Sequence, residues 1–416
     1  MNTFQTEIGG VDVRTLAEQF GTPLYVYDRA VIEKRIAELK SFPTIRYAQK
    51  ANSNLSILAL MRKHGVKVDA VSVGEIHRAL AAGYSPADVV YTADVFDRTA
   101  LEKVVELGVH VNCGSPDMIA QYGKRKGGGE VTIRVNPGFG HGHSQKTNTG
   151  GDQSKHGIWH EEIESCLEIA RKHGVAITGL HMHIGSGTDF KHLAQVGAAM
   201  LACAKRIGPQ LEMISTGGGL PTPYRPEDVR IDVAAFCELW LKQHQEIEAA
   251  LGKKLELEVE PGRYLVAESG HLVAEIRAVK KQGERLFYLL NAGFHNLARP
   301  ILYGAYHPMS VCPADRSRKD NGKRVEAVVG GPLCESGDIF TQRDGGFVEA
   351  RSLPPAAPGD FLVMHCAGAY GFAMSSNYNS YPFAAEAMVS DGKAQAIRDR
   401  QSVEDLVRGE RVIAFD

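Results

Sequence analysis

The sequence has 416 residues, 44% of them hydrophobic and 23% charged, which is close to the ordinary composition of a globular protein. The formal net charge is −2, with 47 basic and 49 acidic residues and no long basic block, so nucleic acid is not an expected partner. No run of about 18 apolar residues could cross a membrane. The first residues do not read as a secretory signal, and we expect a cytoplasmic protein.

The chain is longer than one hydrophobic core usually serves, so we expect two domains, one of which can be a barrel of about 250 residues. Its seven cysteines form no CxxC pair. An odd number of scattered cysteines in a long chain argues against a disulfide framework, and we expect reduced thiols.

From about residue 22 to residue 267, short apolar runs rich in β-branched residues alternate with helical stretches. This pattern is typical of βα units around a parallel sheet. Two examples of the predicted helices are 56–64 and 73–82, each followed by a glycine suited to a left-handed position, Gly65 and Gly83. The candidate strands number eight, the count of a TIM-type (β/α)8 barrel: 45–48, 68–71, 89–92, 109–112, 131–135, 177–183, 211–214 and 255–259.

The segment 136–157 interrupts this rhythm with six glycines and three histidines. An irregular stretch of this length is more often an active-site flap than filler, and we predict a functional loop. Its pair His141 and His143 is expected to be solvated rather than to bind a metal.

After residue 267 the pattern changes to strands separated by turn signals at 280–283, 321–322 and 344–346. We therefore predict a barrel over 22–267 and a mostly β domain over 268–416, which residues 1–21 join. A short helix is expected at 402–409.

Barrel enzymes place their working residues where the strands end, and polar residues gather at those positions here. Glycines 217–219 and the Pro-Gly-Arg of 261–263 follow the last two strands, where exposed backbone N–H groups commonly bind a phosphate. A lone glycine triplet would more often be a tight turn. The polar candidates at the strand ends are Gln49, Lys50, Arg134, Asn136, His181, His183, Ser186 and Glu260.

Lys50 follows the first strand, where a partly desolvated amine has a lowered pKa and can form a Schiff base with an aldehyde. Alone it would be read as a surface lysine. Together with a phosphate site and Glu260, which could pair with a pyridine nitrogen, it matches the needs of an aldehyde cofactor. Glu260 could otherwise form a structural ion pair.

His181 and His183 lie on one face of a strand, a spacing that also suits metal binding. A barrel metallohydrolase would carry its His-x-His on the first strand and an aspartate after the eighth. Here the pair lies on the sixth strand and Glu260 follows the eighth, so a metal site is not expected.

At these residues the sequence closely resembles the fold type III pyridoxal-phosphate-dependent decarboxylases, which combine a barrel with a β domain as in alanine racemase and ornithine decarboxylase. Within them it is most similar to the bacterial group acting on diaminopimelate. The similarity runs through nearly the whole chain, with markers at 47–52 (YAQKAN), 69–75 (DAVSVGE), 181–186 (HMHIGS), 217–219 (GGG), 260–263 (EPGR), 299–303 (RPILY), 334–338 (CESGD) and 368–370 (GAY).

The resemblance implies roles for residues in most of these motifs. Lys50 would carry pyridoxal 5′-phosphate, His183 would stack on its ring and Glu260 would pair with the ring nitrogen. Cys334, delivered by the partner subunit of a homodimer, would return a proton after carbon dioxide leaves, so active sites would be shared. The phosphate region would be held by Ser186, Gly219, Gly262, Arg263 and Tyr370, and the substrate by Arg263, Arg299, Tyr303, Glu335 and Tyr370.

The arginines would bind a distal carboxylate and Glu335 a distal amino group, which favours meso-diaminopimelate, with L-lysine as product. Two departures stand out. Family members often have an aspartate at the position of Asn291, and many have an aspartate and an apolar residue in place of Ser215–Thr216. The alternatives are a decarboxylase of D-lysine or D-ornithine, an amino-acid racemase, and a silent relative, which would be expected to lack Lys50 or Cys334. Without the Glu-Ser-Gly-Asp that follows it, Cys334 would be interpreted as a buried structural thiol.

Overall fold

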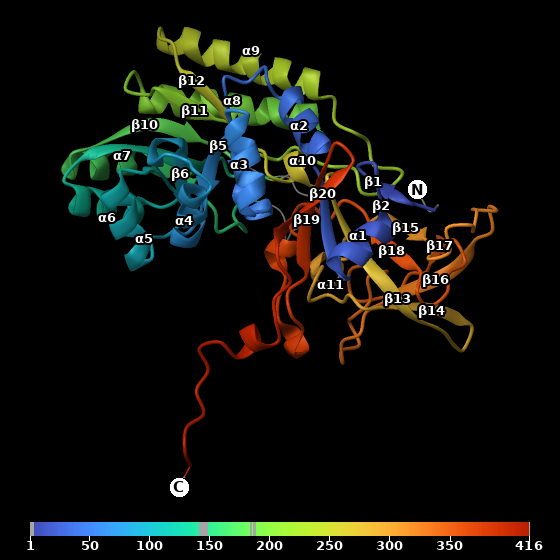
Figure 1. Ribbon diagram of the computed structural model, residues 1–416. Coiled ribbons are helices and arrows are strands. Elements are labelled where there is room, and N and C mark those ends of the chain that lie inside the picture. The colour runs from blue at the N-terminus through green and yellow to red at the C-terminus, as the bar shows by residue number, and fades with distance from the viewer. Residues whose placement is uncertain (1–3, 141–148, 184, 186–188, 416) are drawn as a thin grey trace. The chain divides into compact units, whose positions relative to one another are not determined.

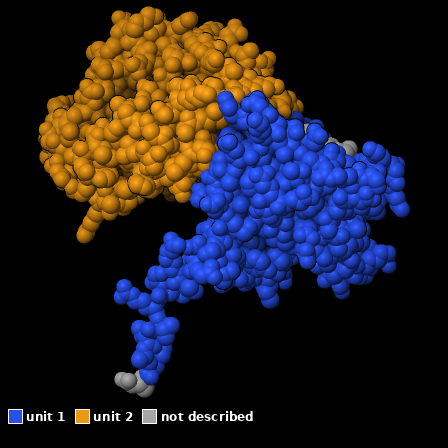
Figure 2. Space-filling model, viewed as in Figure 1, with its two compact units in different colours: residues 1–32, 223–228, 266–416 blue, residues 33–222, 229–265 orange. Residues whose placement is uncertain are grey.

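The computed structural model describes residues 4–140, 149–183, 185 and 189–415. The chain forms two compact units, coloured separately in Figure 2. Unit 1 contains Met1–Ile32, Pro223–Asp228 and Val266–Asp416, and unit 2 contains Glu33–Thr222 and Val229–Leu265. In the described part of the chain, no helix combines the length and the apolar character that crossing a bilayer requires.

Unit 2 is a closed parallel barrel, which confirms the predicted fold (Figure 1). The barrel closes because β12 pairs with β4 and β10 pairs with β8, both in parallel register. Every predicted strand overlaps one of the barrel strands, which are β4 (Thr44–Ala48), β5 (Lys67–Ala70), β6 (Val89–Ala93), β7 (His110–Cys113), β8 (Gly129–Asn136), β10 (Val175–His181), β11 (Met213–Ser215) and β12 (Glu256–Val259). A short strand that we did not predict, β9 (Ile158–Trp159), pairs with the end of β8.

Several of the helices around the barrel begin at polar caps. Asn54 accepts a hydrogen bond from the Ser56 amide, and Ser72 accepts one from the Glu75 amide. The glycines expected after the first two helices do adopt positive φ, +74° at Gly65 and +90° at Gly83. The helices are α2 (Arg29–Glu38), α3 (Leu55–Lys63), α4 (Val73–Ala81), α5 (Arg98–Leu107), α6 (Pro116–Lys126), α7 (Ile163–Lys172), α8 (Phe190–Ile207), α9 (Val233–Leu251) and α10 (Arg263–Val266).

A buried ion pair joins the first and last barrel strands. Arg46 donates two hydrogen bonds to Glu258, of 2.5 and 3.0 Å, and a third to the Asp88 carbonyl. Both side chains are less than a tenth exposed. The pair links the seam where β12 meets β4.

Unit 1 is mostly β, as expected. Its main sheet has the order β17-β16-β14-β13-β3-β19-β20, with β18 joining β13 to β15. The strands are β1 (Glu7–Ile8), β2 (Val11–Asp12), β3 (Leu24–Asp28), β13 (Gly270–Gln282), β14 (Arg285–Leu290), β15 (Met309–Cys312), β16 (Val325–Gly330), β17 (Arg351–Leu353), β18 (Phe361–Met364), β19 (Ala385–Ser390) and β20 (Lys393–Arg398), and the helices are α1 (Val13–Phe20) and α11 (Arg299–Tyr303).

The N-terminal segment is part of this sheet, because β3 pairs with both β13 and β19. Apolar residues of α1, β3 and β19 share one core, which includes Leu16, Val26 and Val389. Asn291 adds a polar link: its Oδ1 accepts from the Glu275 amide and its Nδ2 donates 2.8 Å to the Thr22 hydroxyl. Asn291 thus joins β13 to the segment that precedes β3, all within unit 1.

The helix expected at 402–409 is only a single 3₁₀ turn, Glu404–Val407. Ser402 caps it by accepting from the Asp405 amide, and Gly409 then leaves the helical region at φ +89°. A turn this short is typical of a segment that buries no apolar face.

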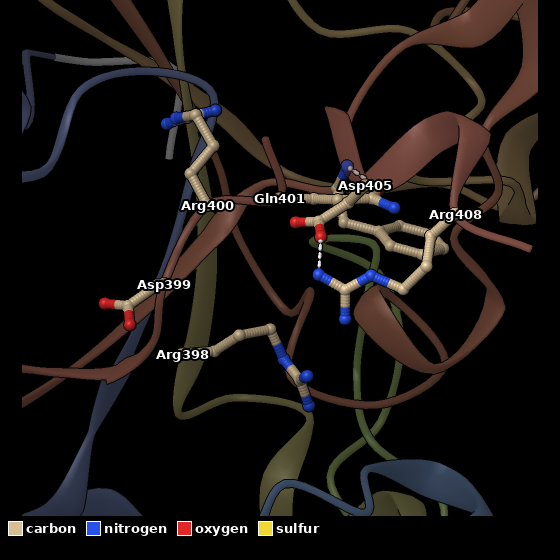
Figure 3. A pocket seen from close by; sticks show the side chains of 7 residues that line it. Arg398, Asp399, Arg400, Gln401, Asp405 and Arg408 are labelled. Carbon is tan, nitrogen blue, oxygen red and sulfur yellow. Dashed lines mark hydrogen bonds and ion pairs between the residues drawn. The ribbon is translucent and has the colours of Figure 1, made fainter. Parts of the chain in front are cut away.

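Next to this turn, unit 1 has an open pocket rich in charge (Figure 3). Arg408 pairs with Asp405 and Arg398 with Glu386, while Arg400 donates to the Pro23 carbonyl. The three arginines of the pocket are thus paired with other groups of the same chain. The described lining of the pocket includes none of the residues expected in the active site. It consists of Phe383, Arg398, Asp399, Arg400, Gln401, Asp405 and Arg408.

Candidate active site

Lys50 lies in a single 3₁₀ turn, Gln49–Ala51, immediately after β4. Its neighbours Gln49 and Ala51 are fully buried, whereas the lysine side chain is exposed. The expected desolvation of this amine by surrounding protein atoms is therefore absent among the described residues. The Lys50 charge nevertheless acts on Asp69 and His183, so the amine lies near these site residues.

Glu260 follows β12 and is the best connected carboxylate of the site. Its Oε2 lies 3.1 Å from Nε2 of His181, and its Oε1 accepts a 2.7 Å hydrogen bond from the Ser215 hydroxyl. Burial alone would raise the pKa of Glu260, but His181, Ser215 and Arg46 outweigh it and hold this pKa well below its ordinary value. Glu260 therefore stays ionised at neutral pH.

Ser215 is one of the two departures noted in the sequence, and the structure gives it a place in the site. Its hydroxyl donates to Glu260 and also accepts a 3.2 Å hydrogen bond from the Gly217 amide. An aspartate here would put a second negative charge against Glu260. Sequence reasoning missed this contribution because Ser215 carried no motif signal of its own.

His183 is half-buried beside the glycine triplet, and its Nδ1 accepts a 3.2 Å hydrogen bond from the Gly218 amide. Burial lowers its pKa well below the ordinary value, and Arg134 and Lys50 add to this effect. The imidazole is therefore neutral. With His181 against Glu260 and His183 against Gly218, the two rings have separate partners.

The three glycines between β11 and α9 form a cradle with no room for side chains. A Cβ on Gly217 would lie 2.6 Å from the His183 Cβ, and one on Gly218 would lie 2.5 Å from the Glu260 carbonyl oxygen. Gly219 has φ +96° and its Cβ would lie 2.3 Å from the Gly185 carbonyl oxygen. The chain can pass this closely only with glycine.

Gly262 belongs to the same site through the first strand. A Cβ there would lie 3.0 Å from the Ala48 carbonyl oxygen, and the Ala48 amide donates to the Pro261 carbonyl. Arg263 follows directly as the first residue of α10 and is half-buried. The turn carrying Lys50 thus lies against the 260–263 motif, as expected for residues at one barrel mouth. Ser186 falls outside the described residues, as do His141 and His143.

Two acidic residues of the 69–75 motif have raised pKa values. Burial, together with Glu260, raises the pKa of Asp69 to about 6, and burial raises that of Glu75 to about 7. At the start of α4 the N-cap Ser72 accepts from the Glu75 amide, and Glu75 accepts a 2.8 Å hydrogen bond from the Val71 amide, one residue before the cap. Asp69 has one buried oxygen without a partner among described residues, so it is a polar group available at the mouth.

The predicted loop after β8 is held by Asn136, whose Nδ2 donates to the Gly151 and His156 carbonyls while its Oδ1 accepts from the Gly151 amide. The Thr149 hydroxyl donates 3.1 Å to the His183 carbonyl. The described part of this loop therefore contacts the site through His183.

The remaining candidates lie in unit 1. Arg299 begins α11 and is only 7% exposed, whereas Tyr303 at the end of that helix is exposed. Cys334 and Glu335 are exposed and precede Gly337, whose position lies against Ile301 of α11. The predicted substrate residues of α11 and the 334–338 motif are therefore close together within this unit.

Asp338 organises the 334–338 motif from inside. Its Oδ2 accepts from the Leu333 amide and its Oδ1 from the Phe294 amide, at 2.8 and 2.7 Å. The amide of Cys334 donates to the side-chain oxygen of Asn379. Cys334 is the only exposed cysteine of the seven, all of which are free thiols. A buried structural role for Cys334 is therefore wrong.

Tyr370 is half-buried and has φ +58°. A bulky residue in the left-handed region is uncommon and costs of order 1 to 3 kcal/mol, and such residues cluster at ligand sites. This backbone supports a functional place for Tyr370.

Comparison with known proteins identifies the family. A sequence model of the pyridoxal-dependent decarboxylases, pyridoxal binding domain, matches residues 29–267. The chain belongs to this family. It is 50% identical to diaminopimelate decarboxylase of Escherichia coli K12 over 406 residues, 97% of both chains, and 36% identical to that of Methanothermobacter thermautotrophicus, covering 98% of this chain and 96% of the relative.

Solved structures agree. A crystal structure of a diaminopimelate decarboxylase, 51% identical, superposes with a TM-score of 0.93 over 95% of both chains. The Helicobacter pylori enzyme, solved in complex with L-lysine, is 30% identical with a TM-score of 0.86 over 95% of this chain and 98% of its own.

The residues of unit 2 fit the cofactor of this family. The glycine cradle lets a phosphate approach the backbone without side chains in the way, Glu260 is an ionised acceptor for a protonated ring nitrogen, and His183 is neutral, as a stacking ring should be. Lys50 supplies the amine. Pyridoxal phosphate is the cofactor implied by both the family and the site.

Proposed function

We propose that this protein is a cytoplasmic carboxy-lyase that removes carbon dioxide from meso-diaminopimelate to form L-lysine, the last step of lysine biosynthesis. The observation that carries the proposal is the 50% identity to diaminopimelate decarboxylases over 97% of the chain. Arg299 supports the choice of substrate, because a buried guanidinium suits a ligand that keeps a second carboxylate away from the reacting carbon.

In unit 2, Lys50 would bind the cofactor aldehyde, and the phosphate would be held by Ser186, Gly219, Gly262 and Arg263, with Tyr370 of unit 1. Bound pyridoxal phosphate would supply the electron sink for the electrons left when the carboxylate departs. Glu260 would accept a hydrogen bond from the protonated ring nitrogen and keep that proton in place. His183 would hold the ring face.

In unit 1, Arg299, Tyr303 and Glu335 would bind the substrate together with Arg263 and Tyr370. The reaction removes one carboxylate as carbon dioxide and must place one proton on the same carbon. We propose that the Cys334 thiol donates this proton, because it is an exposed thiol in a motif that Asp338 holds in shape.

We further propose that the protein acts as a homodimer in which Cys334 and Glu335 serve the partner's Lys50. The high exposure of both residues supports this arrangement, since a group that completes another subunit's site must be reachable. Domain boundaries at residues 22 and 267 belong to the same proposal.

The test is carbon dioxide release by the purified holoenzyme from meso-diaminopimelate, L-lysine, L-ornithine, D-lysine and D-ornithine, with Lys50→Ala as the inactive control. We expect release from diaminopimelate alone. Preference for D-lysine or D-ornithine would overturn the assigned substrate and leave the decarboxylase chemistry in place. No release from any compound would favour a silent relative.

A further inference from the structure

The contacts of Arg299 include an aromatic ring and an imidazole. Its guanidinium carbon lies 4.5 Å from the centre of the Tyr224 ring, and its NH1 lies 2.9 Å from Nε2 of His307. All three residues belong to unit 1. Neither of these two contacts brings a negative charge, and both restrict the orientation of the guanidinium.

The chemistry of the pair determines the state of His307. A guanidinium can only donate, so Nε2 of His307 must be the acceptor. The proton of the neutral ring then lies on Nδ1, which donates 2.9 Å to the His365 carbonyl. His307 is 1% exposed, so this orientation is set by buried partners on both sides of the ring.

Tyr224 is fixed in turn. Its ring meets the His307 ring edge to face, with centroids 5.4 Å apart and planes at 76°. The next residues pair in the same way, since the Arg225 guanidinium lies 4.8 Å over the Tyr306 ring. Arg351 covers that ring at 3.8 Å. Tyr224 thus packs on His307, and the next residue, Arg225, packs on Tyr306.

We propose that His307 and Tyr224 are positioning residues that aim Arg299 at the carboxylate remote from the reacting carbon, and so help to select substrates that possess one. This inference rests on the proposed function, in which Arg299 binds that carboxylate. The hydrogen bond from Arg299 to His307 and the Tyr224 ring face restrict the rotation and the tilt of the planar guanidinium.

The reaction itself supplies a matched pair of ligands. Decarboxylation of meso-diaminopimelate removes one carboxylate, and L-lysine retains the other. The compound 1,5-diaminopentane has the same chain and amines without any carboxylate. Only L-lysine has a carboxylate that Arg299 can bind. The ratio of its affinity to that of 1,5-diaminopentane therefore measures the contribution of Arg299 to binding.

The experiment measures binding of both ligands to the holoenzyme by calorimetry, and KM and kcat for meso-diaminopimelate. The variants are His307→Leu, which removes the acceptor, and His307→Gln, which places an oxygen near the position of Nε2. Tyr224→Leu removes the ring and Tyr224→Phe keeps it. His244→Leu is the control, because His244 is also a buried imidazole bonded to a backbone carbonyl, that of Leu255 next to α9.

We expect His307→Leu to weaken L-lysine binding and raise KM by about tenfold or more, with kcat changed by less than roughly threefold. Binding of 1,5-diaminopentane should be unchanged. His307→Gln should recover most of the loss. Tyr224→Leu should weaken L-lysine binding by about 3- to 30-fold, Tyr224→Phe much less, and His244→Leu not at all.

Unchanged L-lysine affinity in both His307→Leu and Tyr224→Leu would overturn the inference. So would an equal loss for both ligands, which would indicate general damage to the site. If His307→Leu fails to fold, the His307→Gln and Tyr224 variants still decide the matter. Wild-type enzyme that releases no carbon dioxide from diaminopimelate would overturn the proposed function, whereas wild type that decarboxylates it but shows no effect of these variants would overturn the positioning role alone.

Discussion

Nε2 of His181 lies 3.1 Å from Oε2 of Glu260, where strands β10 and β12 end. The imidazole and the Ser215 hydroxyl together make the ionised carboxylate the stable form in a buried position. A carboxylate that stays negative at this depth can keep a proton on a ring nitrogen, and this requirement is the basis of the first prediction.

Replacing Glu260 by glutamine should lower kcat about 10²- to 10³-fold, a loss comparable to removal of one preorganised charge partner from an active site. The measurement is carbon dioxide release at saturating substrate. Ser215→Ala is the graded control: Glu260 keeps its charge but loses one hydrogen bond, so kcat should fall by less than about tenfold. Equal kcat in wild type and Glu260→Gln would contradict the assigned role.

Cys334→Ala should lower kcat by about 10²- to 10⁴-fold, since it removes the group proposed to return the proton. Cys237→Ala, which removes a buried thiol of α9, should leave kcat unchanged. In the wild-type protein a thiol reagent should modify a single fast-reacting cysteine, because Cys334 alone is exposed. Fast modification that leaves the enzyme fully active would argue against Cys334.

Shared active sites predict complementation between two inactive variants. Lys50→Ala and Cys334→Ala dimers, mixed and allowed to exchange subunits, should regain about a quarter of wild-type activity, because half of the dimers would be mixed and one of the two sites in each would be intact. Activity that stays at the level of the separate variants after exchange has been verified would mean that each subunit uses its own Cys334.

The buried pair of Arg46 and Glu258 predicts a stability effect. Arg46→Met leaves Glu258 buried without its partner and should cost about 3 to 5 kcal/mol, seen as a fall in melting temperature of roughly 10 °C for a unit of this size. The double variant Arg46→Met with Glu258→Met should lose less than Arg46→Met alone. If the double variant were the less stable of the two, the pair would contribute more than it costs to bury.

A histidine pair in unit 1, of which His365 is buried and His271 half-buried, predicts acid sensitivity. The Nδ1 atoms of His271 and His365 lie 3.0 Å apart. Burial, aided by His365, lowers the pKa of His271 to about 3, and burial lowers that of His365 to about 4, from 6.5. Between pH 6.5 and 4 the unfolded chain binds protons that the folded chain does not, so the free energy of unfolding decreases as pH falls through this window.

Each such histidine contributes up to about 1.4 kcal/mol per pH unit to that slope. The raised pKa values of Asp69 and Glu75 act in the opposite direction. The informative quantity is therefore the difference in slope between wild type and His271→Gln, measured by denaturant unfolding from pH 4 to 6.5. The variant should have the shallower dependence; an unchanged slope would mean that His271 takes up its proton in the folded state.

Much of the site was predictable because its motifs are local. Lys50, Glu260 and the glycines 217–219 each follow a strand with recognisable apolar periodicity, and the ends of parallel barrel strands meet at one mouth. The same logic could not find Ser215 or His307. A serine at the end of a strand and a buried histidine are common, and only their partners, 45 residues away in Glu260 and 8 residues away in Arg299, give them a role.

By itself the sequence determined the order of strands, the mostly β region after residue 267 and the residue types available for chemistry, because these depend on periodicity and on neighbours along the chain. Only the tertiary structure decided that Glu260 is ionised and that Lys50 is exposed. It also decided that Tyr224 packs with Arg299 in unit 1, although the segments on both sides of Pro223–Asp228 belong to unit 2. The charge of a carboxylate and the orientation of a guanidinium depend on burial and on partners brought from other parts of the chain, which no local pattern encodes.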